Sequence, residues 1–232
     1  MKTVLITGAG RGLGFCLAEE CAHRGYRVLA AARGKSERLA ELCRENSNVT
    51  ALNADVSDYG SVAACRKQAQ AYTDCVDLVI NNAGIFLDLE RLPLEDERFS
   101  FDIFAQEYDV NAVAPLRVVR EFLPLLRKSA MKTIVNISSE AGSMGMQSWR
   151  KSDYTYCMSK AALNSASNLL QLAYGEEGIK VYAVNPGWMR TDMGGANATD
   201  DPMDSARNIM DLAEGDRKEF VFCDCKGSRL EW

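Results

Sequence analysis

The sequence contains one histidine, His23, in 232 residues. A Ser-His-Asp hydrolase needs its histidine beside the nucleophile, so a single histidine argues against that mechanism. The eight cysteines include no C-x-x-C pair, and only Cys223 and Cys225 lie close together, as a C-x-C. Structural zinc sites are built from paired cysteine and histidine ligands, so we predict that this chain has no metal site.

Long apolar runs are also missing. The longest one, residues 28–32, has five residues, whereas a helix needs about 18 or more apolar residues to span a bilayer. The N-terminus passes from Met1-Lys2 directly into a strand-like run, without the charged and then apolar segments that are typical of a signal peptide. We therefore expect a cytoplasmic protein without a membrane segment, whose cysteines stay reduced and are mostly buried as small hydrophobes.

Runs of basic residues are absent as well. Lys and Arg number 27 against 32 Asp and Glu, which gives a formal net charge of -5. This mildly acidic and mixed charge argues against nucleic acid as the main partner. Hydrophobic residues make up 47% of the chain, which at this length allows a sizeable core and excludes a disordered chain.

Short β-branched runs alternate with longer helical patterns along the whole chain. Several runs are apolar throughout, which is typical of parallel strands covered on both faces. Ser36 and Ser57 stand just before helical patterns and are expected to cap them. The alternation, without a linker or repeat, predicts a single α/β domain over residues 1–232, with a doubly wound, mostly parallel, seven-stranded Rossmann-type sheet and helices on both faces. The expected strands are Thr3–Thr7, Arg27–Ala31, Val49–Asn53, Leu78–Asn81, Thr133–Ser138, Lys180–Asn185 and Glu219–Cys223, and the expected helices are Gly12–Arg24, Glu37–Glu45, Asp58–Tyr72, Gln106–Arg127, Tyr154–Gly175 and Pro202–Ala213.

A glycine-rich string, residues 7–14, ends the first expected strand and runs directly into a helix. Small residues let the backbone approach a pyrophosphate, whose charge is then held by N–H groups at the helix N-terminus. A strand before and a helix after are the context that a dinucleotide-binding motif requires, and the alternative is a simple tight turn. We predict a dinucleotide site at Thr7, Gly8, Gly10, Arg11, Gly12, Leu13 and Gly14.

The end of the second expected strand indicates which dinucleotide is bound. A carboxylate there would accept the ribose hydroxyls and favour NAD, but this chain has Ala30-Ala31-Ala32-Arg33. Arg11, in the glycine-rich string, adds a second guanidinium on the same side. Two converging arginine forks suit a 2′-phosphate, and the alternative is that both are solvated surface arginines. The predicted cofactor is NADP (NADPH).

Tyr156 and Lys160 are four residues apart and share one face of an expected helix. A phenol has a pKa of about 10 and is a poor base at neutral pH, but a nearby ammonium favours the phenolate and brings proton transfer into range. Ser138 and Ser139 end an expected strand, where ligands of parallel sheets bind. Each feature alone also fits an ordinary surface lysine, a half-buried tyrosine and two loop serines.

Together these motifs resemble the short-chain dehydrogenase/reductase family, in that family's order and over nearly the whole chain. The resemblance implies that Ser139, rather than Ser138, is the active serine and that Tyr156 and Lys160 are the catalytic pair. It further implies that Asn111, in the long fourth helix, holds the water of a proton relay.

The resemblance also extends the predicted cofactor site. The pair Asp55-Val56 is similar to the family's adenine contact, and the string at 81–84 matches its N-N-A-G motif after the fourth strand. A Pro-Gly pair with a threonine four residues on matches the segment that contacts nicotinamide. The implied further cofactor residues are Asp55, Val56, Asn82, Ala83, Gly84, Tyr156, Lys160, Pro186, Gly187 and Thr191.

The segment 187–195 and the C-terminal tail resemble the C-signal-like short carbonyl reductases. What this implies is hydride transfer between NADP(H) and a small-molecule carbonyl or alcohol, with Tyr156 as general acid/base, Ser139 on the carbonyl oxygen and Lys160 on the ribose hydroxyls. In such families the long helices commonly pair between subunits, so a homodimer or homotetramer is possible. Two alternatives stay open: a dinucleotide-bound signalling or scaffold protein with little turnover, and an NAD-dependent alcohol dehydrogenase of the same fold.

Two features depart from the family pattern. Ser139 and Tyr156 are 17 positions apart, more than is usual in the family. The extra stretch, residues 143–153, is either a flexible, substrate-facing flap or a tolerated surface insertion. The segment after Pro186 is short where longer members insert helices, which predicts an open site. Apolar residues expected near the site are Ile85, Phe86, Met146, Trp149, Trp188 and Met193.

Overall fold

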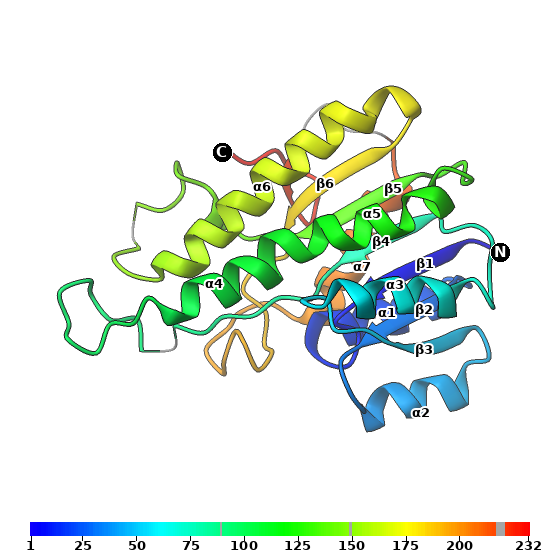
Figure 1. The fold of residues 1–232 in the computed structure, drawn as a ribbon, viewed down its shortest axis with the longest axis horizontal. Coiled ribbons are helices and arrows are strands. Elements are labelled where there is room, and N and C mark those ends of the chain that lie inside the picture. The colour runs from blue at the N-terminus through cyan, green and yellow to red at the C-terminus, as the bar shows by residue number, and fades with distance from the viewer. Residues whose placement is uncertain (89, 149, 217–220) are drawn as a thin grey trace.

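The computed structural model describes residues 1–88, 90–148, 150–216 and 221–232. Within these residues seven strands form one sheet in the order β3-β2-β1-β4-β5-β6-β7, and every neighbouring pair is parallel. The predicted doubly wound fold is therefore confirmed, with the change of winding direction between β1 and β4 (Figure 1). The strands are β1 (Thr3–Thr7), β2 (Arg27–Ala32), β3 (Val49–Asn53), β4 (Leu78–Asn81), β5 (Thr133–Ile137), β6 (Lys180–Asn185) and β7 (Phe222–Asp224).

Helices cover both faces of this sheet. Helices α1, α2 and α7 share one hydrophobic layer with the sheet, and α3, α5 and α6 share the other. All residues of β1, β4 and β5 are buried, which explains why the middle of these strands is mostly apolar instead of alternating between apolar and polar residues. The helices are α1 (Gly12–His23), α2 (Glu37–Glu45), α3 (Tyr59–Ala69), α4 (Asp102–Tyr108), α5 (Ala114–Leu126), α6 (Tyr154–Tyr174) and α7 (Pro202–Glu214).

The fourth expected helix differs most from its prediction. It was expected over Gln106–Arg127, but α4 begins at Asp102, and a π-helical turn, η1 (Asp109–Val113), separates α4 from α5. Pro115 has no N–H and so has no donor to offer the carbonyl of Asn111, four residues earlier. The α-helical ladder is therefore interrupted at Asn111, and π turns of this kind frequently mark functional sites.

The two expected caps fare differently. Ser36 caps α2 as predicted, since its hydroxyl accepts from the N–H of Leu39 at 3.3 Å. The prediction for Ser57 is wrong, because Asp58 caps α3 and accepts from the N–H of Gly60 at 2.8 Å. The Ser57 hydroxyl instead donates to the carboxylate of Asp55 at 2.6 Å, which removes it from the helix terminus.

Other boundaries differ by a few residues. Helix α3 ends three residues before Tyr72, and β5 ends one residue before Ser138. The last strand, expected over Glu219–Cys223, is observed from Phe222 to Asp224, and the expected residues 219 and 220 lie outside the described residues. In the part of the chain that the structure describes, no helix is long and apolar enough to cross a membrane.

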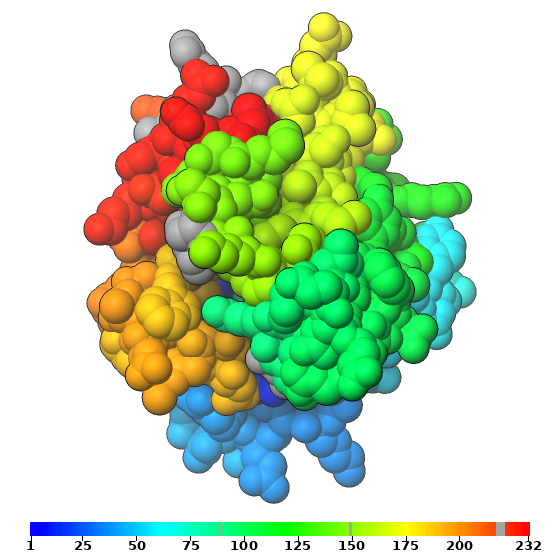
Figure 2. Space-filling view, turned by 90° about the vertical axis from the view of Figure 1, so that its left-hand side faces the viewer, coloured from blue at the N-terminus to red at the C-terminus, as the bar shows by residue number. Residues whose placement is uncertain are grey.

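In Figure 1 the strands run toward the left-hand side, and Figure 2 views the molecule from that side, at which the strands have their carboxyl ends. Three connections gather there: the loop after β4 (green), the segment 143–153 (yellow-green) and the segment after β6 (orange). The surface is hollowed between the green and orange parts, below the yellow-green part. Ligands of open parallel sheets bind at this edge, so the candidate site lies at this hollow.

Candidate active site

The glycine-rich turn is closely packed against the loop that follows β4. A Cβ at Gly8, which has φ +68°, would lie 2.9 Å from the Cα of Ala83, and one at Gly14 would overlap the Gly8 carbonyl oxygen. The side-chain amide of Asn82 donates to the carbonyl of Thr7 at 2.9 Å, and the Thr7 hydroxyl accepts from the N–H groups of Asn82 and Ala83, both at 3.1 Å. Only glycine fits these positions, and the expected cofactor residues of the two segments lie together.

The N-terminus of α1 is open to an anion. Among the described residues no side chain caps this helix, whose N-cap Arg11 is extended, and its first turn carries no acidic residue. Gly10 has its carbonyl fixed by the Ser36 hydroxyl at 2.7 Å, and Leu13 is buried under the turn. Gly12, with φ +53°, faces the methyl group of Thr191. Uncapped N–H groups and a glycine cradle fit the pyrophosphate of a dinucleotide.

The two arginines expected to bind a 2′-phosphate face carboxylates of their own. Arg11 lies 3.1 Å from Asp192, and Arg33 lies 3.9 Å from Asp55. The side chains of Arg11 and Arg33 are 79% and 70% exposed, and exposed pairs of this kind are weak enough to be exchanged for a phosphate. The hydroxyl of Ser57 and then the Arg33 charge keep the pKa of Asp55 below its usual value. The two guanidiniums thus pair with different carboxylates in this arrangement.

The catalytic candidates meet at the start of α6. Lys160 is 5% exposed, and its Nζ lies 5.6 Å from the ring centre of Tyr156 and donates to the carbonyl of Ile137 at 2.8 Å. Ser139 begins the short turn η2 (Glu140–Gly142), where its hydroxyl accepts from the N–H of Ala141 at 3.1 Å. Ser138, in contrast, is buried, and its hydroxyl donates to the side-chain oxygen of Asn164 on α6 at 2.6 Å. Ser139 is therefore the serine available to a ligand.

The surroundings of this cluster shift two pKa values in opposite directions. Burial raises the pKa of Tyr156 to about 12, although a hydrogen bond with Ser139 and the charge of Arg150 lower it. Burial also lowers the pKa of Lys160 to about 8, against the carboxylate of Glu107, which raises it. At neutral pH the phenol therefore carries its proton, and it can donate that proton to an oxygen placed beside it.

Asn111 lies behind this cluster, in the π turn η1. Its side-chain oxygen accepts from the N–H of Ile85 at 2.9 Å, and its amide donates to the carbonyl of Ile85 at 2.9 Å and to the hydroxyl of Ser159 at 3.0 Å. A Cβ at Gly84 would lie 3.3 Å from the Asn111 oxygen and 3.8 Å from Lys160 Nζ. The side chain of Asn111 thus ties the loop after β4 to α6.

The segment after β6 folds back on itself beside the glycine-rich turn. A Cβ at Gly187, with φ +91°, would overlap the carboxylate of Asp200, which accepts from the N–H of Trp188 at 2.8 Å. The indole N–H of Trp188 donates to the carbonyl of Gly194 at 2.9 Å. The carbonyl of Pro186 accepts from the hydroxyl of Ser205, a buried residue of α7, at 2.9 Å. This segment places its predicted cofactor residues next to α1, whereas Asp55 and Val56 lie at the opposite edge, after β3.

Three residues lie near Tyr156: Phe86, which was expected near the site, and Glu107 and Arg150, which were not predicted. Phe86 packs its ring against Tyr156 with centres 5.1 Å apart and the planes at 74°. Glu107 is fully buried and accepts from the N–H of Leu87 at 2.9 Å, and burial raises the pKa of its carboxyl. Glu107 precedes Asn111 by one helical turn, a spacing that could have indicated it. Arg150 lies in the segment 143–153 and has no such local signal.

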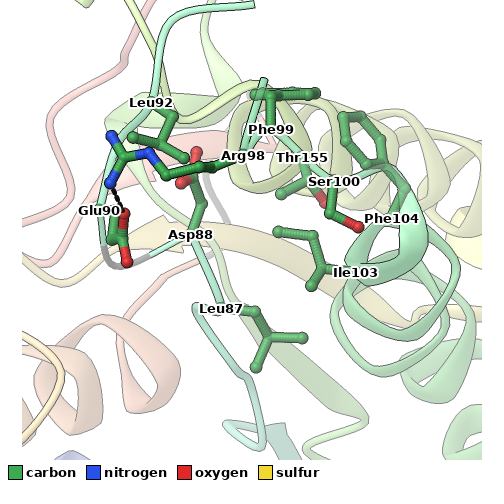
Figure 3. A pocket seen from close by; sticks show the side chains of 10 residues that line it. All are labelled: Leu87, Asp88, Glu90, Leu92, Arg98, Phe99, Ser100, Ile103, Phe104 and Thr155. Carbon is green, nitrogen blue, oxygen red and sulfur yellow. Dashed lines mark hydrogen bonds and ion pairs between the residues drawn. The ribbon is translucent and has the colours of Figure 1, made fainter. Parts of the chain in front are cut away.

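A pocket of about 320 Å³ lies beside the cluster (Figure 3). In Figure 3, Phe99, Ile103 and Phe104 lie on one side of it, and the ion pair of Glu90 and Arg98 lies on the other, next to Leu92. Arg98 Nη1 is 3.0 Å from Glu90 Oε2. Thr155, which precedes Tyr156 in α6, connects the pocket to the cluster. Of the apolar residues expected near the site, Trp149 lies outside the described residues. The pocket is lined by Leu87, Asp88, Glu90, Leu92, Arg98, Phe99, Ser100, Ile103, Phe104 and Thr155.

Known proteins share this sequence pattern and this arrangement. The sequence model of the short chain dehydrogenases matches residues 2–202. The oxidoreductase UcpA of Escherichia coli (strain K12) is 34% identical over 194 residues, which cover 83% of this chain and 71% of UcpA. The C-signal protein of Myxococcus xanthus is 34% identical over 165 residues, which cover 69% of this chain and 95% of C-signal.

A solved structure agrees over the whole chain. The NADPH-bound carbonyl reductase from chicken fatty liver superimposes with a TM-score of 0.90 at 28% identity, and the match covers 100% of this chain and 99% of that one.

Proposed function

This chain belongs to the short-chain dehydrogenase family, and we propose that it is an NADP-dependent carbonyl reductase that transfers hydride between NADP(H) and a small carbonyl or alcohol. The observation that carries the proposal is the cluster of Ser139, Tyr156 and Lys160 at the edge of the sheet that also holds the glycine cradle. A group of donors of this kind has no use in a protein that only binds a dinucleotide. Residues 1–232 act as one catalytic domain.

The cofactor is held along the carboxyl edge of the sheet. The glycine-rich turn and the N-terminus of α1 take the pyrophosphate, Asp55 and Val56 take the adenine, and Pro186, Gly187 and Thr191 take the nicotinamide end. Lys160 binds the ribose hydroxyls, and Asn82, Ala83 and Gly84 shape the wall between the two halves. When bound, the dinucleotide supplies the hydride for carbonyl reduction.

Proton transfer depends on Tyr156. Its phenol donates a proton to the carbonyl oxygen of the substrate while the hydroxyl of Ser139 holds the same oxygen. In the reverse direction the phenolate accepts the proton of the alcohol, and the nearby Lys160 ammonium favours that form. A water on the carbonyl of Asn111 returns a proton from solvent through Lys160. This role is supported by the position of Asn111, since a Cβ at Gly84 would lie 3.3 Å from its side-chain oxygen and 3.8 Å from Lys160 Nζ.

The experiment that tests this function is NADPH oxidation against a panel of aldehydes, ketones and 3-oxoacyl thioesters, followed by the loss of reduced-nicotinamide absorbance. We expect turnover with at least one class. Tight NADPH binding with no turnover on any class would contradict the proposal and favour a signalling or scaffold role. This second candidate function is kept because one relative is named C-signal.

The preference for NADPH over NADH depends on Arg33 and Arg11. We expect Arg33→Ala to raise the Kd for NADPH about 10- to 150-fold, because a charge-assisted bond to a phosphate contributes about 1.5–3 kcal/mol, and to leave the Kd for NADH unchanged. Fluorescence titration with both dinucleotides measures this. The matched control is Arg44→Ala, which removes an exposed arginine of α2. Equal binding of both dinucleotides by the unchanged protein would contradict the NADP assignment.

Lys160 is expected to lower stability while it serves the reaction. Burial lowers its pKa from 10.5 to about 8, so the fold disfavours the ammonium. This cost is present in full below pH 8 and is relieved as pH rises toward 10.5. We expect Lys160→Met to abolish activity and to raise the free energy of unfolding by about 1–2 kcal/mol at pH 7, after the loss of one hydrogen bond. Thermal unfolding at pH 7 and pH 10 tests this, and a gain that does not shrink at pH 10 would contradict it.

A further inference from the structure

Arg150 is a surface-loop residue whose guanidinium is largely buried. It lies in the segment 143–153, and its side chain is only 13% exposed. One nitrogen, Nη1, donates to the carboxylate of Asp153 at 2.9 Å, and the other, Nη2, donates to the carboxylate of Glu140 at 3.4 Å. Burying a guanidinium is costly unless carboxylates pair with it, so this side chain is placed by specific contacts and not by chance.

The two carboxylates belong to the two elements that carry the reaction. Glu140 directly follows Ser139 in the turn η2. Asp153 is the N-cap residue of α6, three positions before Tyr156. Its main-chain carbonyl accepts from the N–H of Cys157 at 2.9 Å. The Asp153 side chain is 3% exposed and its backbone is left-handed, with φ +65°. Arg150 therefore connects the turn that holds the serine to the helix that holds the tyrosine.

Arg91 adds a second cation at the same carboxylate. Its guanidinium lies 3.3 Å from Asp153 and 5.7 Å from the ring centre of Phe86, which in turn packs against Tyr156. Arg91 is 56% exposed and comes from the loop after β4, so its contact is the weaker of the two. Asp153 consequently keeps one cationic partner when Arg150 is changed, which makes the Arg150 variants usable as tests.

The charge of Arg150 also acts on the phenol. The groups that face Tyr156 are the Ser139 hydroxyl and Arg150, which lower its pKa, and Glu107 of α4 and the neighbouring Cys157, which raise it. Lys160, on the same helix, lies 5.6 Å from the ring centre. Arg150 and Glu107 thus shift the pKa of Tyr156 in opposite directions.

We propose that Arg150 is a positioning residue for proton transfer, because it ties the Ser139 turn to the Tyr156 helix and places a positive charge that favours the phenolate. This inference rests on the proposed reductase function and adds to it. The planar fork of arginine suits the task, since its two nitrogens reach two carboxylates at once, which a lysine ammonium does not do in fixed geometry. The unusual length between Ser139 and Tyr156 therefore contains the residue that holds the two together.

The test compares the pH dependence of kcat/KM for alcohol oxidation, in which Tyr156 acts as the base. We expect Arg150→Met to move the acidic limb to higher pH, because the phenolate loses a favourable charge, and to lower kcat/KM at pH 7 by roughly tenfold. Arg150→Lys keeps the positive charge, so we expect the acidic limb of the pH profile to stay at nearly the same pH. We expect kcat to fall severalfold, because a lysine does not contact both carboxylates as the guanidinium does. Lys151→Met is the matched control, an exposed neighbour that removes the same charge from the same segment.

A purely structural role of Arg150 would lower the rate by the same factor at every pH, and an unmoved limb in Arg150→Met would therefore overturn the inference. If Arg150→Met does not fold, Glu140→Gln tests only the connection between the Ser139 turn and α6. This change removes the ion pair of Arg150 with Glu140, and the buried guanidinium keeps its ion pair with Asp153. We then expect kcat to fall severalfold with an unchanged KM for NADPH, and an unchanged kcat would overturn the tie.

The proposed function fails in a different way. In that case Tyr156→Phe retains turnover, or no carbonyl or alcohol is converted at all. If Tyr156→Phe is inactive while Arg150→Met shows an unmoved limb, only the role of Arg150 is wrong. Combining the two changes separates the cases further, since in Tyr156→Phe the loss from Arg150→Met is expected to shrink to the severalfold effect of the lost tie, without any pH dependence.

Discussion

Replacing Tyr156 with phenylalanine is expected to lower kcat of carbonyl reduction by about 10²–10⁴-fold, the range that a positioned proton donor contributes. The change removes one oxygen and keeps the ring, so its edge contact with Phe86 and the approach of Lys160 are preserved. The cofactor cradle lies on other elements, and the Kd for NADPH is therefore expected to change less than threefold, which is about 0.6 kcal/mol. Steady-state kinetics and a fluorescence titration measure the two quantities.

A matched control for this change stands on the same helix. Tyr154 lies two residues earlier, is half exposed and packs against Phe99, away from the Lys160 ammonium. We expect Tyr154→Phe to keep normal turnover. Near-normal turnover in Tyr156→Phe, or an equal loss in both variants, would mean that Tyr156 is not the proton donor.

Adding one methyl group at Gly14 is expected to abolish cofactor binding. A Cβ there would overlap the Gly8 carbonyl oxygen and the side-chain amide of Asn82. Those two atoms belong to the glycine-rich turn and to the loop after β4, so the methyl group must push apart the two walls of the cradle. We expect Gly14→Ala to weaken NADPH binding by at least about 100-fold and to lower stability by about 1–3 kcal/mol, as overpacking does.

Gly60→Ala is the control for this prediction. Gly60 lies in the first turn of α3 with no positive φ, where alanine is tolerated and its added Cβ would lie 3.3 Å from an exposed carboxylate. NADPH titration and thermal unfolding of the two variants give the comparison. Normal NADPH binding by Gly14→Ala would show that the cofactor does not use this cradle.

Local patterns were sufficient to predict the sheet and the glycine-rich turn. Strands such as β1 and β4 are buried on both faces, so each contains three consecutive apolar residues that are visible in the sequence. The turn needs glycine at Gly8 and Gly14 because neighbouring backbone and side-chain atoms leave no room for a Cβ. Requirements of this kind act on single positions, and for that reason they leave a readable pattern.

Contacts between distant segments were not predictable in the same way. A helical pattern does not reveal the π turn that contains Asn111, because this turn is a short interruption within a longer helical stretch. The burial of Glu107 depends on the path of the loop after β4, and the placement of Arg150 depends on Glu140 and Asp153. Arg11 and Arg33 face carboxylates instead of one shared spot, since each has an acidic neighbour that the sequence pattern does not bring near.

The fate of the transferred hydride tests the central claim most directly. The protein is incubated with NADPH that carries deuterium at the transferable position and with a carbonyl that supports turnover, and the alcohol is analysed by mass spectrometry. We predict one deuterium on the carbinol carbon, with this product almost absent in Tyr156→Phe although NADPH still binds. Tight NADPH binding without deuterated alcohol for any carbonyl of the panel would contradict the assignment of this chain as a reductase.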